Sequence, residues 1–367
     1  MACQDEDGCV PRNEKLSQHC HRRPRTPKGA SLPIDVHAHY VPPQLIAAVT
    51  ARGGELGVRL APSPGNAPPA LHFDYGFKVR PFFPRLVEPV AQRIAWLDEQ
   101  GIDLQVVGTW PDIFGYGLAP DACAAWHRML NETLAEWCDD NAGRFAWIGS
   151  VPLTQADAAA QELDRIATTG GCGVIISSNI ENVNIGELPL DPFWRKAEAL
   201  GLPVLIHPVL VGPAPRAAKF GLAQVAQYTF DTTLGVGSLL LSGVLDRFPG
   251  LKLVLSHGGG AYPYLAGRFD IMHRRMDRQA QGDVALKAPS AYASQMAYDS
   301  IVHAPKALRF LVAVAGLDNV VLGTDYSFPP ADMEPLALLR AAGLSPADVS
   351  AIADGNPRRI FARLKDR

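Results

Sequence analysis

The sequence of 367 residues has no uninterrupted apolar stretch of the roughly 18 to 20 residues that a membrane-spanning helix needs. The longest apolar run, at 202–211, is interrupted by one histidine and two prolines. The residues after Met1 are polar and charged, so the chain shows no secretory signal there. We therefore expect a cytoplasmic protein that does not bind a membrane.

A strong excess of charge of one sign is also lacking. The formal net charge is only −3, which gives no electrostatic reason to expect nucleic acid or an anionic membrane as a partner. With 47% hydrophobic and 19% charged residues, the chain can bury a large core, either as one barrel-sized domain or as two domains.

Closely spaced cysteine pairs are missing as well. Three of the six cysteines lie in apolar surroundings and are expected to be reduced core residues, namely Cys123, Cys138 and Cys172. The other three lie within residues 1–30, which are poor in apolar side chains and also hold His19 and His21. Because no C-x-x-C pair is present, this stretch favours a flexible leader over a structural metal site.

The chain does contain a regular alternation of short apolar runs and longer amphipathic stretches. The runs predict strands at 34–37, 104–108, 145–151, 173–177, 204–207, 253–257, 297–300 and 320–324. The stretches between them predict helices at 89–100, 121–140, 155–168, 192–200, 232–248, 262–279 and 305–314. This alternation indicates an α/β protein, and its strand count favours a (β/α)8 TIM barrel over an open doubly wound sheet. No G-x-G-x-x-G follows the first strand, which disfavours a dinucleotide-binding fold.

The expected domain organisation is a leader at 1–30 and a single barrel domain at 31–367. Residues 52–88 break the alternation, because they are rich in proline and glycine and show no clear period. An insertion after the first strand would lie over the carboxyl end of the barrel, so we interpret it as a lid or substrate arm. Residues 331–367 predict two or three helices that pack outside the barrel.

The most informative motif ends the first predicted strand, where His37 and His39 are separated by one residue. Alternate side chains of a strand share a face, so both imidazoles point the same way. Two neutral nitrogen ligands on one face suit a first-row divalent ion. Taken alone, the pair is as compatible with one packed core histidine and a coincidental neighbour as it is with metal binding.

Three further ligand-type residues follow other predicted strands, at His207, His257 and Asp325. Each alone is compatible with a cap or turn residue, but a barrel brings the carboxyl ends of its strands around one mouth. Three histidines and a carboxylate make a zinc site with room for a water, and the remaining histidine can serve as an acid–base group. No lysine occurs between Lys78 and Lys196, so the fourth strand offers no carboxylated lysine and one metal per chain is favoured.

Other polar residues are weaker candidates. Asp299, at the end of the seventh predicted strand, can orient a ligand or the base. His303 follows the same strand and His72 lies in the insertion, and for both the sequence leaves open whether they reach the pocket. His127 and His273 fall in helix patterns and are interpreted as surface or packing residues.

These motifs together resemble the amidohydrolase superfamily. Within it, they resemble the branch of 2-amino-3-carboxymuconate 6-semialdehyde decarboxylase and related aromatic-acid decarboxylases. The matching stretches run in the same order and with the same spacing from 34 to about 330, at 34–39, 93–103, 114–116, 207–208, 257–260, 267–270 and 323–329.

The resemblance implies zinc ligands at His37, His39, His207 and Asp325, with His257 activating water or moving the proton. It also implies two arginines that hold substrate carboxylates, Arg80 in the insertion and Arg268, which in the family's dimers reaches the neighbouring subunit's site. Without the resemblance, either arginine is equally well a surface or ion-pair residue. Phe328, in the stretch that follows Asp325, is assigned to substrate binding.

The function that we expect is zinc-dependent, non-oxidative decarboxylation of an unsaturated or aromatic carboxylic acid by a homodimer. The carbon that loses CO2 must first become sp3, through hydroxide from a zinc-bound water with His257 as base, or through protonation by an acid. Residues 209–216 lack the tryptophan and acidic residue typical of the semialdehyde decarboxylase, so another small carboxylate, such as a hydroxybenzoate, fits as substrate. The alternative is a metal-dependent hydrolase or hydratase, and a regulatory or structural metal-binding barrel is disfavoured by the complete ligand set.

Overall fold

The structure is a computed structural model that describes residues 32–63, 65, 67–210, 212, 214–276 and 284–364. Residues Ser31–Arg367 form one compact unit. The leader predicted at 1–30, with its cysteines and histidines, lies outside the described residues.

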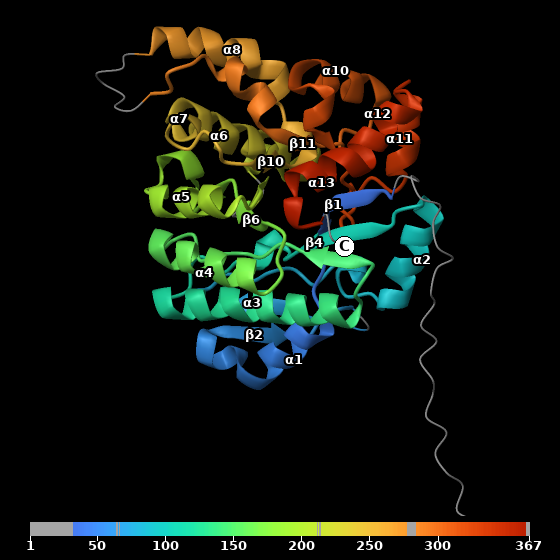
Figure 1. The fold of residues 1–367 in the computed structure, drawn as a ribbon. Helices are drawn as coiled ribbons and strands as arrows, with labels where there is room; N and C mark the ends of the chain where they lie inside the picture. The colour runs from blue at the N-terminus through green and yellow to red at the C-terminus, as the bar shows by residue number, and fades with distance from the viewer. Residues whose placement is uncertain are drawn as a thin grey trace, which may run out of the picture. The chain divides into compact units, whose positions relative to one another are not determined.

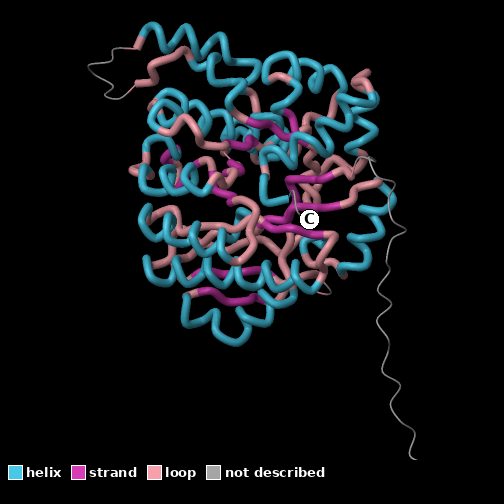
Figure 2. Tube along the Cα trace, viewed as in Figure 1, coloured by secondary structure: helices cyan, strands magenta, loops and turns pink. Residues whose placement is uncertain are grey.

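Parallel strands form the centre of the described unit, and Figure 2 shows them surrounded by helices. One sheet has three strands in the order β1-β4-β5, and the other has five in the order β12-β11-β10-β9-β6. Their bounds are Ile34–His39 (β1), Leu104–Gly108 (β4), Phe145–Trp147 (β5), Val174–Ser177 (β6), Val204–His207 (β9), Leu253–Leu255 (β10), Ala297–Asp299 (β11) and Val320–Val321 (β12). All of their residues are buried and most are apolar, as expected for parallel strands covered on both faces. The predicted α/β class with parallel strands is confirmed.

The edges of the two sheets are joined by hydrogen bonds on both sides. Between β5 and β6, Gly149 bridges to Val174 in parallel, and the amide of Ile175 donates to the carbonyl of Gly149 at 2.8 Å. Between β12 and β1, Ala38 bridges to Tyr326, and the amide of Val36 donates to Leu322 at 2.9 Å.

Helices separate the strands along the chain, and Figure 1 shows α3, α4 and α5 stacked one beside the next. Their bounds are Val90–Gln100 (α2), Pro120–Asp140 (α3), Ala156–Thr168 (α4), Asp191–Leu200 (α5), Tyr228–Leu241 (α6), Val244–Arg247 (α7), Tyr262–Arg275 (α8) and Pro305–Ala315 (α10). The single helix predicted at 232–248 is two helices, because Gly243 between them takes a left-handed φ of 71°. Within the described residues, no helix combines the length and the apolar character needed to cross a membrane.

The predicted insertion is a folded element rather than an irregular loop. Helix α1 (Pro43–Arg52) precedes it, and it contains an antiparallel hairpin of β2 (Val58–Ala61) and β3 (Ala70–Phe73). Apolar side chains of the hairpin pack with Trp110 and Trp126 in a common buried cluster. At the other end of the chain, the predicted C-terminal helices are α11 (Pro335–Ala341), α12 (Pro346–Ser350) and α13 (Asn356–Ile360).

Candidate metal centre

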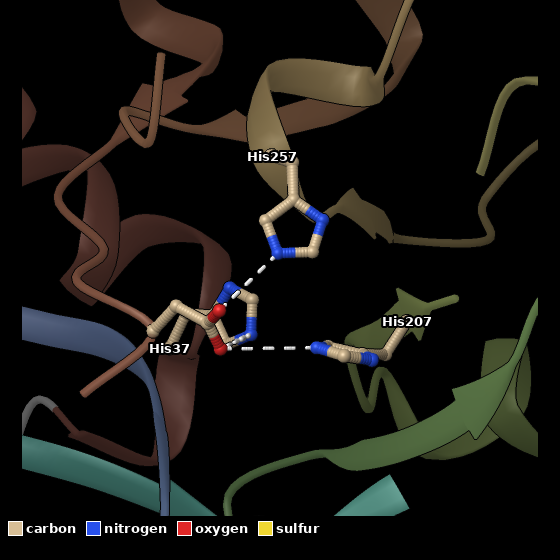
Figure 3. Close-up of side chains that lie close together, drawn as sticks. His37, His207 and His257 are labelled. Carbon is tan, nitrogen blue, oxygen red and sulfur yellow. Dashed lines mark hydrogen bonds and ion pairs between the residues drawn. The ribbon is translucent and has the colours of Figure 1, made fainter. Parts of the chain in front are cut away.

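Five polar side chains meet where the parallel strands end. His37 and His39 are both fully buried on β1, and His207 is the last residue of β9. His257 follows β10 and Asp325 follows β12. Figure 3 shows the imidazoles of His37, His207 and His257 converging on one carboxylate. The sequence predicted that the carboxyl ends of these strands would share one mouth, and the structure places all five residues there.

The Asp325 carboxylate is the centre of this group. Its Oδ1 lies 3.1 Å from Nε2 of His39, 3.4 Å from Nε2 of His37 and 3.8 Å from Nε2 of His207. Its Oδ2 lies 3.4 Å from Nε2 of His257. Potential ligand atoms of His37, His207, His257 and Asp325 all lie within 4.8 Å of one another. This group contains His257 in place of the predicted ligand His39, although Nε2 of His39 is the imidazole nitrogen nearest to Asp325 Oδ1.

Hydrogen bonds on the far side of three imidazoles orient their Nε2 atoms towards Asp325. Nδ1 of His37 faces Oδ2 of Asp299 at 2.7 Å, Nδ1 of His39 faces the carbonyl of Thr109 at 3.2 Å, and Nδ1 of His207 faces the carbonyl of Pro208 at 2.9 Å. A carbonyl or carboxylate oxygen can only accept, so each Nδ1 carries the donated proton. Each neutral ring then presents a lone pair at Nε2, which is the arrangement that metal-binding histidines adopt.

These converging acceptors fit a cation. Nε2 of His37 and Nε2 of His39 are 3.1 Å apart, too close for two lone pairs without a proton or a positive ion between them. Nε2 of His207 and Oδ1 of Asp325 are buried and have no hydrogen-bond partner among the residues that the structure describes. Imidazole nitrogens with one carboxylate oxygen form a common donor set for a divalent transition metal.

The pKa values of the group favour the forms that bind a metal. Burial alone would raise the pKa of Asp325, but the surrounding imidazoles of His207, His257 and His39 outweigh burial and hold it well below the usual range. Burial lowers the pKa of His207 to about 3. For His37, burial disfavours the protonated form, but the hydrogen bond to Asp299 and the charge of Asp325 outweigh burial and raise its pKa. His37 is therefore the ligand at which a proton competes most with a metal.

Asp299 supports the group from behind, as the sequence suggested for an orienting residue. Besides its contact with His37, it accepts the backbone N–H of His257 at 2.9 Å and of Gly258 at 2.8 Å. These bonds hold His257 at a left-handed φ of 54°, and Asp325 has a φ of 55°. Non-glycine residues seldom adopt this conformation, and when they do they are often at functional sites.

Sequence reasoning missed Asp35, a fully buried carboxyl two residues before His37 on β1. It accepts hydrogen bonds from the Thr324 hydroxyl at 2.6 Å, the Gln105 amide at 2.8 Å and the backbone N–H of His37 at 3.1 Å. Burial raises its pKa to about 6. The available signal was its place between Ile34 and Val36, where an otherwise apolar strand carries a carboxylate.

A cavity of about 290 Å³ opens onto this centre. Its lining includes His257 and Asp325 together with the predicted substrate residues Arg80 and Phe328, and also His303. Its aromatic wall is formed by Phe83, Trp110 and Phe328, with the ring of Phe328 5.5 Å from that of Phe83. Arg80 donates to Oδ2 of Asp112 at 3.2 Å and lies over the Phe83 ring, with Cζ 4.6 Å from its centroid.

Four further residues considered from the sequence do not line this cavity of the single chain. Arg268 is exposed on α8, and His72 pairs with Arg59 in the hairpin. His127 and His273 are buried packing residues, and Nδ1 of His127 lies 2.9 Å from the Ser150 hydroxyl.

Comparisons with known proteins agree with these observations. The chain is 34% identical over 251 residues to 2-amino-3-carboxymuconate-6-semialdehyde decarboxylase of Dictyostelium discoideum, covering 68% of this chain and 69% of that protein. The crystal structure of 5-carboxyvanillate decarboxylase from Sphingomonas paucimobilis matches with a TM-score of 0.73 at 24% identity, over 91% of this chain and 99% of that one. That of a dihydroxybenzoic acid decarboxylase from Polaromonas sp. JS666, with bound manganese and the inhibitor 2-nitroresorcinol, matches with a TM-score of 0.69 at 20% identity, over 92% and 98%. The model of the amidohydrolase family matches residues 34–363, and the chain belongs to that family, as its motifs predicted.

Proposed function

We propose that this protein is a metal-dependent, non-oxidative decarboxylase of an unsaturated or aromatic carboxylic acid. The observation that carries this proposal is the cavity, whose lining combines Arg80 and an aromatic wall with His257 and Asp325. The named activities of the three relatives support it, since all are decarboxylases of carboxylated unsaturated or aromatic compounds. The hydrogen bonds that join the edges of the two sheets support a closed (β/α)8 barrel around the site. The insertion at 52–88 then serves as a substrate arm beside the cavity, to which it contributes Arg80 and Phe83.

His37, His39, His207 and Asp325 are the ligands that we assign to one divalent metal per chain, and we propose zinc as that metal. His39 takes precedence over His257 because its Nε2 approaches the same Asp325 oxygen as the other two imidazoles. His257 approaches the other oxygen, and its side chain remains 14% exposed towards the cavity. When bound, a divalent metal supplies a Lewis acid that polarises a coordinated oxygen.

The cavity walls suit a planar acid. The rings of Phe83, Trp110 and Phe328 offer flat apolar surfaces against which an unsaturated or aromatic ring can stack. Arg80 has one Nη2 contact with Asp112 and retains further N–H donors for a substrate carboxylate. Asp112 thereby fixes the guanidinium in the cavity before substrate arrives.

Decarboxylation exchanges a carbon–carbon bond for a carbon–hydrogen bond, so the carbon that releases CO2 must gain a proton. We assign delivery of this proton to Nε2 of His257, whose backbone Asp299 fixes at the edge of the cavity. Protonation converts the reacting carbon from sp2 to sp3, after which the electrons of the breaking bond can restore the double bond. The aromatic wall limits access of water to this carbon.

The test is CO2 release from the metal-loaded protein incubated with carboxylated muconates and hydroxybenzoates. We expect stoichiometric CO2 and the decarboxylated product from at least one acid. A product that has gained water without CO2 would instead establish the hydratase or hydrolase alternative. No turnover of any acid by metal-loaded protein would contradict the decarboxylase.

The role of Arg80 is tested separately by Arg80→Lys. A lysine keeps the charge but loses the planar fork, so we expect kcat/KM to fall about ten- to a hundred-fold, mainly through KM. Arg59→Lys is the matched control, because Arg59 lies in the same insertion, is 63% exposed and pairs with Asp74 outside the cavity. Equal kinetics of the two variants would remove Arg80 from substrate binding.

A further inference from the structure

Arg93, the arginine of α2, is buried without any exposed surface. All three nitrogen atoms of the Arg93 guanidinium donate hydrogen bonds, and the acceptors come from segments far apart in the sequence. They are Glu88 Oε1 at 3.2 Å, Gln105 Oε1 at 3.1 Å, the Ser327 hydroxyl at 2.8 Å, and the carbonyls of His39 at 3.0 Å and Arg85 at 2.9 Å.

Aromatic rings complete the surroundings of this buried charge. Cζ of Arg93 lies 4.7 Å from the ring centroid of Tyr40 and 4.6 Å from that of Tyr326. Glu88 supplies a counter-charge, since its carboxylate is 10% exposed and forms an ion pair with Nε. A guanidinium removed from water requires such complete pairing, so every one of these contacts contributes to keeping it in place.

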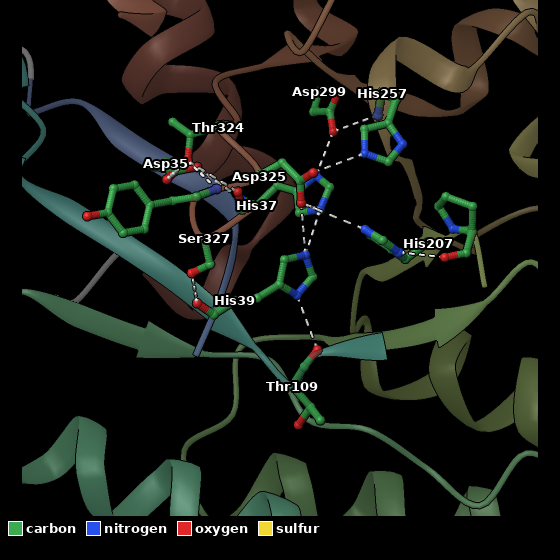
Figure 4. A network of polar contacts seen from close by, with 12 residues as sticks. Asp35, His37, His39, Thr109, His207, His257, Asp299, Thr324, Asp325 and Ser327 are labelled. Carbon is green, nitrogen blue, oxygen red and sulfur yellow. Dashed lines mark hydrogen bonds and ion pairs between the residues drawn. The ribbon is translucent and has the colours of Figure 1, made fainter. Parts of the chain in front are cut away.

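Two of the acceptors, one carbonyl and one hydroxyl, belong to segments that carry proposed metal ligands. The carbonyl of His39 accepts from Arg93 and also from the Ser327 hydroxyl at 2.8 Å, a bond that Figure 4 shows. Ser327 is two residues after Asp325, in a loop where these residues have φ values of 115° and 55°. Arg93 therefore links the end of β1 to the strained loop that presents the Asp325 carboxylate.

A third acceptor connects the substrate arm. Arg85 lies in the insertion, five residues after Arg80. Its carbonyl accepts a hydrogen bond from Nη2 of Arg93, the same nitrogen that donates to His39 and Ser327. Nη2 of Arg93 thus donates hydrogen bonds to three segments: the end of β1, the loop that follows Asp325, and the insertion.

We propose that Arg93 is a positioning residue that sets the separation of His39 and Asp325 at the metal centre. It contacts neither the cavity nor any proposed ligand atom, and it acts through the two backbone segments. Because this role rests on the metal site proposed above, its readout is metal affinity rather than turnover. Lysine cannot take over the role, since an ammonium offers one nitrogen where the guanidinium uses three.

The experiment measures the dissociation constant of zinc for the metal-stripped full-length protein in competition with a chromophoric chelator. The variants are Arg93→Lys and the milder Ser327→Ala, which removes only the hydroxyl between Arg93 and His39. Arg144→Lys is the matched control, because Arg144 also donates to backbone carbonyls, those of Asp103 at 3.0 Å and Ile102 at 3.2 Å. Both carbonyls come just before β4, at the amino end of that strand, whereas the candidate metal centre lies at the carboxyl ends of the strands. Thermal unfolding of each variant checks that it is folded.

We expect both Arg93→Lys and Ser327→Ala to bind zinc about ten- to a hundred-fold more weakly than the parent, the usual effect of losing support behind a metal ligand. Arg144→Lys should lower the thermal midpoint without changing zinc affinity. If Arg93→Lys fails to fold, Ser327→Ala alone decides. Folded variants with parental zinc affinity would overturn the role of Arg93. Parent protein that binds no zinc, or a His39→Ala variant that binds it unchanged, would overturn the metal site itself and the positioning role with it.

Discussion

The Asp299 carboxylate accepts a hydrogen bond from Nδ1 of His37 at 2.7 Å. The same oxygen also accepts the backbone N–H of His257 at 2.9 Å (Figure 4). One buried carboxylate therefore orients a proposed metal ligand and fixes the backbone of the proposed proton carrier. Because the carboxylate can only accept, the N–H groups of His37 and His257 are both oriented towards it before a metal or a substrate binds.

Asp299→Asn should weaken metal binding about ten- to a hundred-fold, because the neutral amide has one acceptor oxygen where the carboxylate has two. The measurement is metal retained after dialysis against a chelator. Asp98→Asn is the control, since Asp98 is 51% exposed and pairs with Arg144 away from the site. Equal retention in the two variants would contradict the orienting role of Asp299.

His257→Ala and His39→Ala should affect different properties, turnover in the first and metal binding in the second. The first should keep its metal and lose at least about 10²-fold in turnover, the usual scale for an acid–base residue. The second should lose the metal, because Nε2 of His39 lies 3.1 Å from the shared Asp325 oxygen. Elemental analysis and CO2 release on the same samples separate the two. Metal loss in His257→Ala with retention in His39→Ala would reverse the two assignments.

Acid should destabilise the protein through His127, a buried histidine outside the metal centre whose pKa burial lowers to about 3 from 6.5. Between these values the unfolded chain holds a proton that the folded chain does not, so stability falls as the pH falls, by about 1.4 kcal/mol per pH unit. Asp35 acts in the opposite direction between 3.8 and about 6, since the folded state there binds the extra proton.

The contribution of His127 is isolated by comparing the parent with His127→Gln. Urea unfolding of both proteins in the presence of a chelator, between about pH 4 and about pH 6, should give a slope of stability against pH that is smaller in the variant by about 1.4 kcal/mol per unit. Parallel slopes would show that His127 titrates normally in the folded state.

The cluster at the candidate metal centre could be predicted from the sequence because its residues lie at or just after strand ends. His37 and His39 share a face by the period of a strand, and the parallel order brings His207 and Asp325 to the same edge. The partners of Asp35 and Arg93 were not predictable, since Thr324 and Ser327 lie more than two hundred residues away and no local pattern marks such pairs. The hairpin at 58–73 was missed because its short strands are separated by a long proline-containing loop rather than a tight turn.

The active form is predicted to be a homodimer in which Arg268 completes the partner's pocket. Arg268 is exposed on α8, which also exposes Ile271 and Met272, and the adjoining α6 exposes Phe230 and Leu234. Mixing inactive Arg268→Ala and His257→Ala proteins under subunit exchange should restore up to about half of the activity per mixed dimer, since one pocket then carries neither change. Demonstrated exchange without recovery would place Arg268 outside the partner's site.

The most direct test of the account is a titration of metal-free protein with zinc, in which the rate of CO2 release is followed for an acid that the parent decarboxylates. We predict that the rate rises from near zero, saturates at one equivalent of zinc per chain, and stays near zero in a His37→Ala, His39→Ala double variant. A rate that is independent of added metal, that saturates only at two equivalents, or that survives loss of both histidines would contradict it.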